Sequence, residues 1–201
     1  MNQASLAAGA VAGGFHDPVH DAQRVFRAVM DAFARPGTVA ELGGLVSAPP
    51  AVEPAAAALL ATLADADAAV CLEERDEAAA AWIAFQTDAP VVVDPADAVF
   101  ALLARGSDPA GWMRFPIGTD SYPDRSATLI LPVAALEGGP VLRLEGPGIE
   151  TSRSLAPLGL PEGFLAARQA NAALFPRGHD HVLVAGTRLA ALPRTTRITE
   201  A

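Results

Sequence analysis

Four consecutive residues near the end of the chain, Arg194, Thr195, Thr196 and Arg197, combine two guanidinium groups with two hydroxyls. Such donors bind phosphate or carboxylate through charge-assisted hydrogen bonds. The chain has no lysine, so all 14 of its basic residues are arginines. This segment is therefore the densest candidate for an anion site, and Arg177 is a further candidate for binding a ligand or a partner.

Strand geometry leaves the role of this segment open. Successive side chains of a strand point to opposite faces, so Arg194 and Thr196 would lie on one side and Thr195 and Arg197 on the other. The four groups could then not all bind one ligand. The alternatives are contact with a ligand, contact with a partner protein, an ion-pair anchor between subunits, and an edge strand whose arginines prevent aggregation.

Composition excludes several classes of function. Without lysine the chain has no Schiff base for pyridoxal phosphate and no P-loop, and it contains neither a G-x-S-x-G nor a G-x-G-x-x-G motif. A formal net charge of -9 argues against duplex nucleic acid and anionic membranes as partners. No apolar run reaches the roughly eighteen residues of a transmembrane helix. We expect no nucleic-acid partner, no membrane span and no cofactor.

The four histidines occur as two pairs, and neither pair predicts a metal site. His16 and His20 are four apart at the start of a helix, while His179 and His181 are two apart at the start of a strand. Two ligands without a third are a weak metal signal, so we expect both pairs to be exposed and no metal to bind. The single cysteine, Cys71, lies in an apolar run and is expected to be a small buried hydrophobe.

Alternating helical and strand patterns predict an α/β fold. Asp17 and Pro18 are typical of a helix start, apolar residues follow at helical spacing, and Arg35-Pro36-Gly37 ends that helix. Glu73-Glu74 and Asp76-Glu77 indicate solvation and charge at a helix N-terminus rather than catalysis. The further predicted elements are strand 38–42, helix 54–64, strand 68–72, helix 76–85, strand 90–93, helix 94–104, strands 127–131 and 141–144, helix 161–174, and final strands 182–185 and 189–192.

Two connections have features of their own. Residues 105–125 are rich in Gly, Pro and Asp, which is typical of a long functional or interface loop. A short link that contains Gly138-Gly139-Pro140 joins strands 127–131 and 141–144. This link predicts that the two strands pair as an antiparallel hairpin.

A set of short motifs is specific in its order and spacing. The motifs are Asp17-Pro18-Val19 with Ala22-Gln23, Phe26-Arg27, Arg35-Pro36-Gly37, Leu60-Ala61-Thr62-Leu63-Ala64-Asp65, Ser126-Ala127-Thr128-Leu129-Ile130-Leu131, Leu142-Arg143-Leu144 with Gly146 and Gly148-Ile149, Phe175-Pro176 with Gly178 and Asp180, and Leu192-Pro193-Arg194-Thr195-Thr196. Together they resemble the H-subunit (PhnH) family of the bacterial carbon–phosphorus lyase machinery. The resemblance covers nearly the whole chain after about residue 14.

The resemblance implies a fold and an assembly. The fold is a three-layer α/β/α arrangement around a mixed sheet, similar to that of the pyridoxal-phosphate-dependent transferases but without the cofactor site. A flexible segment 1–14 precedes a single domain, 15–201, of a cytoplasmic protein. Members of the family form homodimers and join a core complex with the G, I and J subunits. Histidine commonly stands where this chain has Gln86, so no acid/base role is expected at that position.

The resemblance also implies a reaction. With the G, I and L subunits, such a protein is needed to displace adenine from MgATP with an alkylphosphonate, which forms α-D-ribose 1-methylphosphonate 5-triphosphate. The I subunit is implied to carry the chemistry, and no catalytic residue transfers to this chain. We therefore expect a non-catalytic structural or binding subunit. The alternative is an independent enzyme or binding protein for a phosphorylated metabolite at the Arg194–Arg197 segment.

Overall fold

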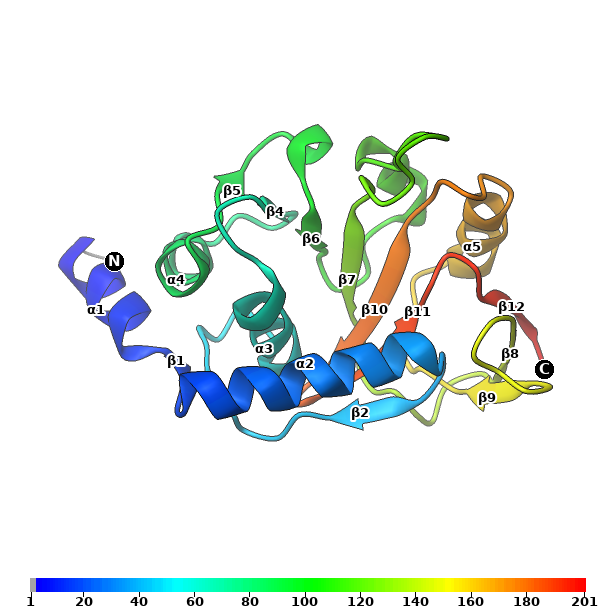
Figure 1. The fold of residues 1–201 in the computed structure, drawn as a ribbon, viewed down its shortest axis with the longest axis horizontal. Coiled ribbons are helices and arrows are strands. Elements are labelled where there is room, and N and C mark those ends of the chain that lie inside the picture. Colours follow the sequence, from blue (N-terminus) through cyan, green and yellow to red (C-terminus); the bar gives the residue numbers. More distant parts are fainter. Residues whose placement is uncertain (1–2) are drawn as a thin grey trace.

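The computed structural model describes residues 3–201 and contains helices around three separate β-sheets (Figure 1). The helices are α1 (Gln3–Ala12), α2 (Pro18–Ala34), α3 (Pro54–Leu63), α4 (Glu77–Thr87) and α5 (Phe164–Ala172), with two 3₁₀ segments, η1 (Pro95–Asp97) and η2 (Pro109–Arg114). The strands are β1 (Gly14–Phe15), β2 (Val39–Glu41), β3 (Val46–Ser47), β4 (Val70–Leu72), β5 (Val91–Val92), β6 (Phe100–Leu102), β7 (Thr128–Pro132), β8 (Leu142–Glu145), β9 (Arg153–Leu155), β10 (Asp180–Ala185), β11 (Arg188–Leu192) and β12 (Arg197–Glu200).

The central sheet has seven strands in the order β2-β11-β10-β7-β6-β4-β5. The pairings from β10 through β7, β6 and β4 to β5 are parallel, whereas β10–β11 and β11–β2 are antiparallel. A second, antiparallel sheet has the order β12-β8-β9, and β1 pairs with β3. The predicted α/β class with a mixed sheet is thus confirmed.

Alternate residues of the central strands face two separate cores. Val70 and Leu72 of β4 pack into the core that contains α2, α3 and α4, and Cys71 between them faces the other core. That second core is closed by η2, α5 and the three-stranded sheet. Burial on both faces explains why the inner strands are apolar at almost every position. The layer on the second face therefore combines one helix with a small sheet.

Helix α2 begins and ends where its sequence predicts. Asp17 caps it by accepting a hydrogen bond from the backbone N–H of His20 at 3.2 Å, and Pro18 occupies the first turn. The helix ends at Ala34, directly before Arg35-Pro36-Gly37. The cap satisfies one free N–H group of the first turn, and the helix stops before the proline.

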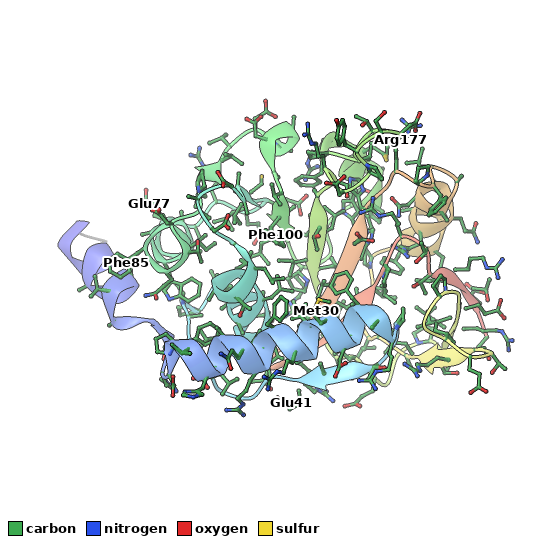
Figure 2. The ribbon with its side chains drawn as sticks, in the orientation of Figure 1. Met30, Glu41, Glu77, Phe85, Phe100 and Arg177 are labelled. Carbon is green, nitrogen blue, oxygen red and sulfur yellow. The ribbon has the colours of Figure 1, made fainter. Side chains whose placement is uncertain are left out.

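One face of α2 is apolar and unpacked. The buried side chains of the helix include Val25 and Val29, whereas Val19, Phe26 and Met30 are 63%, 48% and 54% exposed. Met30 is labelled on α2, the long helix in Figure 2. The apolar face of α2 is thus wider than the part of the helix that packs against the core.

The helix predicted over 94–104 is wrong. Asp94 does accept a hydrogen bond from the backbone N–H of Ala96 at 3.0 Å, but this cap supports only the single turn of η1. Phe100 then begins β6, which pairs with β4 and β7 and is buried along its length. A short apolar run fits a buried strand as well as a helix, and here pairing between two parallel neighbours prevails.

The hairpin predicted for 127–131 and 141–144 is also wrong. Strand β7 lies between β6 and β10 in the central sheet, so both of its edges are already paired. Strand β8 instead pairs with β12 and β9. The glycine-rich link carries the chain from one sheet to the other, and β12, rather than residues 189–192, is the last strand.

The N-terminal segment is attached through Gln86. The side-chain nitrogen of Gln86 donates to the carbonyl oxygens of Ala10 at 2.6 Å and Gly13 at 3.0 Å. The stretch predicted as flexible, 1–14, includes α1, which extends beside α4 at one end of the molecule (Figure 1). Between residues 3 and 201, no helix combines the length and apolar character that crossing a membrane requires.

Candidate functional site

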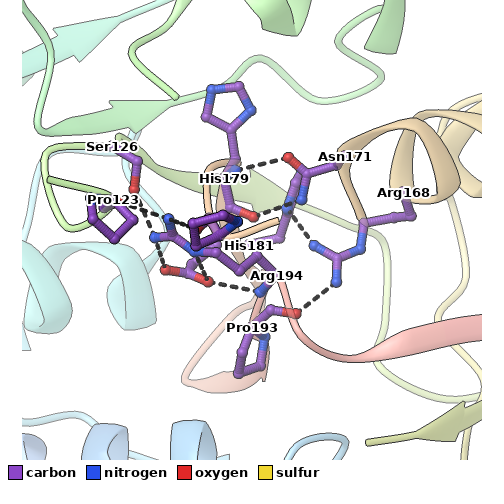
Figure 3. A network of polar contacts seen from close by, with 10 residues as sticks. Pro123, Ser126, Arg168, Asn171, His179, His181, Pro193 and Arg194 are labelled. Atoms are coloured by element: carbon purple, nitrogen blue, oxygen red, sulfur yellow. Dashed lines mark hydrogen bonds and ion pairs between the residues drawn. The ribbon is translucent and has the colours of Figure 1, made fainter. Parts of the chain in front are cut away.

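Arg194 is the centre of a polar network that ties the C-terminal region to the rest of the domain (Figure 3). Its Nε and Nη2 atoms donate to the two carboxylate oxygens of Asp180 at 3.2 and 2.6 Å, and its backbone N–H donates to the same carboxylate at 2.7 Å. Nη1 donates to the carbonyl oxygen of Pro123 at 2.7 Å, and Nη2 to the hydroxyl of Ser126 at 2.6 Å. We call these four residues the Arg194 network.

The Arg194 network joins three distant parts of the sequence. Pro123 belongs to the long loop before β7, Asp180 begins β10, and Arg194 lies in the turn between β11 and β12. A forked Arg–carboxylate pair is both strong and geometrically specific. The Arg194 side chain is only 13% exposed, so water weakens the pair little. The guanidinium therefore directs most of its donors to groups of its own chain.

Arg168 of α5 is a second buried guanidinium, and it forms no ion pair within residues 3–201. Its Nη2 donates to the carbonyl oxygens of Pro193 at 2.7 Å and Thr196 at 3.1 Å, and its Nη1 donates to Nδ1 of His181 at 2.9 Å. Burial lowers the pKa of Arg168 to about 10, although the charge of Asp180 opposes the shift. The group thus stays protonated at neutral pH, as a buried cation that contacts only neutral acceptors.

The contact with Arg168 fixes the protonation of His181. A guanidinium can only donate, so Nδ1 of His181 accepts and the ring proton resides on Nε2. Burial, followed by the charge of Arg168, holds the pKa of His181 well below its usual range. The ring is therefore neutral at physiological pH. Its Nε2 atom is buried and has no hydrogen-bond partner in the described part of the chain.

Asn171 holds His179 through its main chain. The amide of Asn171 donates to the carbonyl oxygen of His179 at 2.9 Å and accepts from its backbone N–H at 2.7 Å. Nε2 of the His179 ring donates to the carbonyl oxygen of Phe115 at 3.2 Å. Burial lowers the pKa of His179, and the bond to Phe115 opposes this shift. This neighbour of the Arg194 network is thus rigidly placed.

The prediction that His179 and His181 are exposed is wrong, because they are 2% and 1% exposed. The face of the sheet on which they lie is covered by aromatic residues, and the rings of Trp112 and His181 are 5.1 Å apart. The other pair, His16 and His20, is exposed as predicted. Within residues 3–201, no group of three or more His, Cys, Asp or Glu side chains is close enough to hold a metal ion.

The structure separates the four residues of the predicted anion segment. Arg194 and Thr195 form a turn rather than a strand, so the expected alternation of faces begins only at Arg197. Thr196 is buried at 1% exposure, and Thr195 is half-buried. Arg197 is 75% exposed and lies 3.9 Å from Glu145 on β8. The two guanidiniums thus have different environments, one internal and one facing solvent.

Arg177, the fifth predicted residue, lies away from Arg197. It pairs with Asp120 of the long loop at 3.1 Å and is 38% exposed. In Figure 2 it is at the top of the molecule, above α5, whereas β12 lies lower at the edge. It shares the region of the Arg194 network because Nη1 of Arg194 also lies 3.4 Å from the carbonyl oxygen of Pro176.

Arg168 and Asn171, which contact His181 and His179, were not predicted from the sequence, and neither were the partners of Arg194 in its network. A signal for the two α5 residues exists, because Phe164, Arg168 and Asn171 stand at positions i, i+4 and i+7 of one helix face. Phe164 is expected to be buried, and the residues in line with it share that environment. Phe175 lies beyond the end of α5 and is 65% exposed.

A cavity of about 430 Å³ opens at the carboxyl ends of β4 and β5. Ligands of open α/β sheets commonly bind at this edge. Its walls include Cys71 and an ion pair between Arg114 and Glu73. Burial raises the pKa of the Cys71 thiol, which favours the protonated form over a nucleophilic thiolate. Cys71 is 3% exposed, so its predicted burial is confirmed.

Comparison with known proteins gives one family. The sequence model of the family described as "Bacterial phosphonate metabolism protein (PhnH)" matches residues 13–199. A protein of Rhizobium meliloti (strain 1021), named "Alpha-D-ribose 1-methylphosphonate 5-triphosphate synthase subunit PhnH", is 44% identical over 188 residues, which cover 92% of this chain and 94% of that protein. The "Putative C-P lyase subunit protein HtxG" of Stutzerimonas stutzeri is 40% identical over 82 residues, 41% of this chain and 42% of that protein.

The family match spans the Arg194 network, α5 and the central sheet, and the Rhizobium relative aligns over nearly its whole length. The family match covers the motifs on which the resemblance was based, and the alignment with the Rhizobium relative, which covers 92% of this chain, agrees with it. The chain belongs to the PhnH family of bacterial phosphonate metabolism proteins.

Proposed function

We propose that this chain is a subunit of the bacterial carbon–phosphorus lyase system for the breakdown of organophosphonates. The observation that carries this conclusion is the 44% identity to a named synthase subunit over 94% of that subunit's length. The second relative, named as a C-P lyase subunit, agrees with the same system. The reaction of such a synthase forms α-D-ribose 1-methylphosphonate 5-triphosphate, from MgATP and an alkylphosphonate with release of adenine.

Within that system, the chain acts as a structural or binding subunit alongside the G, I and L subunits. The disposition of its arginines supports this role. Arg194 binds Asp180, Ser126 and Pro123, and Arg168 binds main-chain carbonyl groups and His181. Both guanidiniums thus stabilise the domain itself. The alternative, a phosphorylated ligand held by Arg194 and Arg197, would require Arg194 to release Asp180.

The partners are a second copy of this chain and the G, I and J subunits of the core complex. Val19, Phe26 and Met30 on α2 support a protein partner, because they form an exposed apolar stripe on the longest helix of the structure. Exposed apolar patches of this kind are typical of protein interfaces. The stripe is the surface that we expect a partner subunit to cover.

The fold relationship and the compartment are part of the same proposal. A seven-stranded mixed sheet with layers on both faces is compatible with descent from a pyridoxal-phosphate-dependent transferase. Because the sequence has no lysine, such a descendant would work without that cofactor. A phosphonate-degrading complex that consumes MgATP would work in the cytoplasm.

Co-purification tests the assignment. The chain is expressed with an affinity tag together with the G, I and J subunits, and the eluted proteins are identified by mass spectrometry and native mass measurement. A complex that contains all four subunits supports the proposal. Elution of this chain without the others, under conditions in which G, I and J still bind one another, would contradict it.

A further inference from the structure

A second cavity, of about 410 Å³, lies between η2 and α5, away from the carboxyl ends of β4 and β5. Trp112 and Met113 of η2 line one side, and Ala166, Ala167 and Ala170 of α5 line the other. Most of this surface is apolar, and the cavity has the size and character of small-molecule sites. Met113 is 55% exposed, and its flexible side chain can adapt to an occupant.

Two polar groups at this cavity come from the chain segment that begins β10. His179 and His181 both contribute to its lining. The side chain of Asn171 on α5 holds the backbone of His179 in place through two hydrogen bonds. Nδ1 of His181 is already bonded to Arg168 at 2.9 Å. The N–H at Nε2 is then the one donor of this ring that has no acceptor, and it is buried.

The surroundings of His181 make this donor strong. Arg168 is a buried cation whose hydrogen bonds go to His181 and to main-chain oxygens. A charged donor at Nδ1 draws electron density from the imidazole ring, so the opposite N–H donates more strongly. Without an acceptor, this N–H carries the desolvation cost of an unpaired buried polar group, which an acceptor atom of a ligand would remove.

Negative charge at the cavity disfavours anionic ligands. Asp108 and Glu162 line the cavity, and both are exposed carboxylates. They repel a ligand that carries several negative charges, such as a nucleoside triphosphate. The apolar walls favour an uncharged body, and Trp112, which is 5.1 Å from the His181 ring, favours a flat one.

We propose that the cavity between η2 and α5 binds an uncharged, mainly apolar small molecule whose carbonyl or ring acceptor takes the Nε2 hydrogen of His181. The site depends only on contacts within this chain, so it stands independently of the proposed role in carbon–phosphorus bond cleavage. Its parts are the apolar walls from two helical segments, one oriented donor, and two carboxylates that select against anions.

Benzamide is a suitable probe because it has a flat apolar ring and a neutral carbonyl. In the full-length protein with ¹⁵N-labelled histidine, NMR follows the His181 Nε2–H resonance during a benzamide titration. We expect a saturable downfield shift at His181 and weaker binding of toluene, which has no acceptor, and of benzoate, which is charged. No shift at His181 up to the solubility limit of benzamide, or benzoate binding as tightly as benzamide, would overturn the proposal.

Two matched pairs of variants complete the test. His181→Asn can keep an acceptor near Arg168 but removes the Nε2 donor. It is expected to lower the affinity for benzamide roughly threefold to tenfold. His181→Gln places an amide N–H near the same point and retains more of the binding. If both variants unfold, Ala170→Phe fills the cavity from the exposed side of α5, and Ala173→Phe, outside the cavity, is its control. Loss of binding in Ala170→Phe alone supports the site, and equal binding in both overturns it.

Discussion

Arg194 donates three hydrogen bonds to the carboxylate of Asp180, two from its guanidinium and one from its backbone N–H, at 2.6 to 3.2 Å. Through this pair, the turn after β11 is fixed to the start of β10 and to the loop that precedes β7. Arg194, a candidate for binding an external anion by its sequence, thus already binds the carboxylate of Asp180 within the same chain.

Arg194→Ala is expected to lower the free energy of unfolding by roughly 2–4 kcal/mol, because it leaves the half-buried Asp180 carboxylate unpaired. Arg194→Lys restores only part of this loss, since an ammonium group cannot reproduce the planar fork. Urea denaturation measures both effects. Arg197→Ala is the matched control, and it should cost less than about 0.5 kcal/mol because its contact with Glu145 is long and exposed.

The two buried histidines predict a pH dependence of stability. Burial lowers the pKa of His179 and, more strongly, that of His181, from an unperturbed value of 6.5. Below about pH 6.5 the unfolded chain takes up protons that the folded chain does not, so stability is lost as the pH falls. Each histidine contributes up to about 1.4 kcal/mol per pH unit.

Thermal or urea unfolding between pH 7.5 and 5 measures this loss. His181→Asn, which cannot titrate, is expected to flatten the profile below pH 6.5, and the exposed control His16→Gln should leave it unchanged. A profile for His181→Asn as steep as that of the wild type would show that His181 takes up its proton equally in the folded and the unfolded chain.

Much of the fold follows from local sequence signals, and the exceptions share a cause. The cap at Asp17 and the break at Pro36 define α2 without help from the rest of the chain. In contrast, β6 and β8 depend on partners that are distant in sequence. Asp94 begins a helix by local rules, but β4 and β7 draw Phe100–Leu102 into the sheet. Local propensity cannot predict which strand edges are already occupied.

The site was predictable only in part for a similar reason. Arg194 stands out by type and spacing, but nothing local indicates that Asp180 lies opposite it. His179 and His181 were expected on the surface because they are polar, whereas α5 brings Arg168 and Asn171 to meet them. The burial of a polar side chain depends on partners from other elements, which the sequence around it does not reveal.

The apolar stripe on α2 predicts an interface. Phe26→Glu and Met30→Glu place a charge on exposed apolar positions, so each should weaken binding to the partner subunit at least about tenfold. Because both side chains are about half exposed, the unfolding temperature should change by less than about 2 °C. Size-exclusion chromatography with light scattering and co-purification measure the assembly.

The control for the α2 interface is Arg24→Gln, which lowers the net charge by one, as the apolar-site variants do, at an exposed position on another face of the helix. Assembly should be unaffected by this substitution. If both apolar-site variants form the same complexes as the wild type, α2 is not the contact surface.

Gln86 is expected to stabilise the N-terminal segment locally, with little effect on the free energy of unfolding of the whole domain. Gln86→Ala removes two hydrogen bonds to the carbonyl oxygens of Ala10 and Gly13, which hold the end of α1. Hydrogen exchange followed by mass spectrometry should then show faster exchange in residues 8–14, with little change in the central sheet. Gln169→Ala, at an exposed site on α5, is the control. Unchanged exchange in residues 8–14 would mean that other contacts hold α1.

The central claim is that this chain is a required subunit of a phosphonate-processing complex, and release of adenine from MgATP measures it most directly. The assay contains an alkylphosphonate and the G, I and L subunits, with or without this chain, and also this chain alone. We predict adenine release only when this chain and its partners are present together. Undiminished release without the chain, or release by the chain alone, would contradict the account.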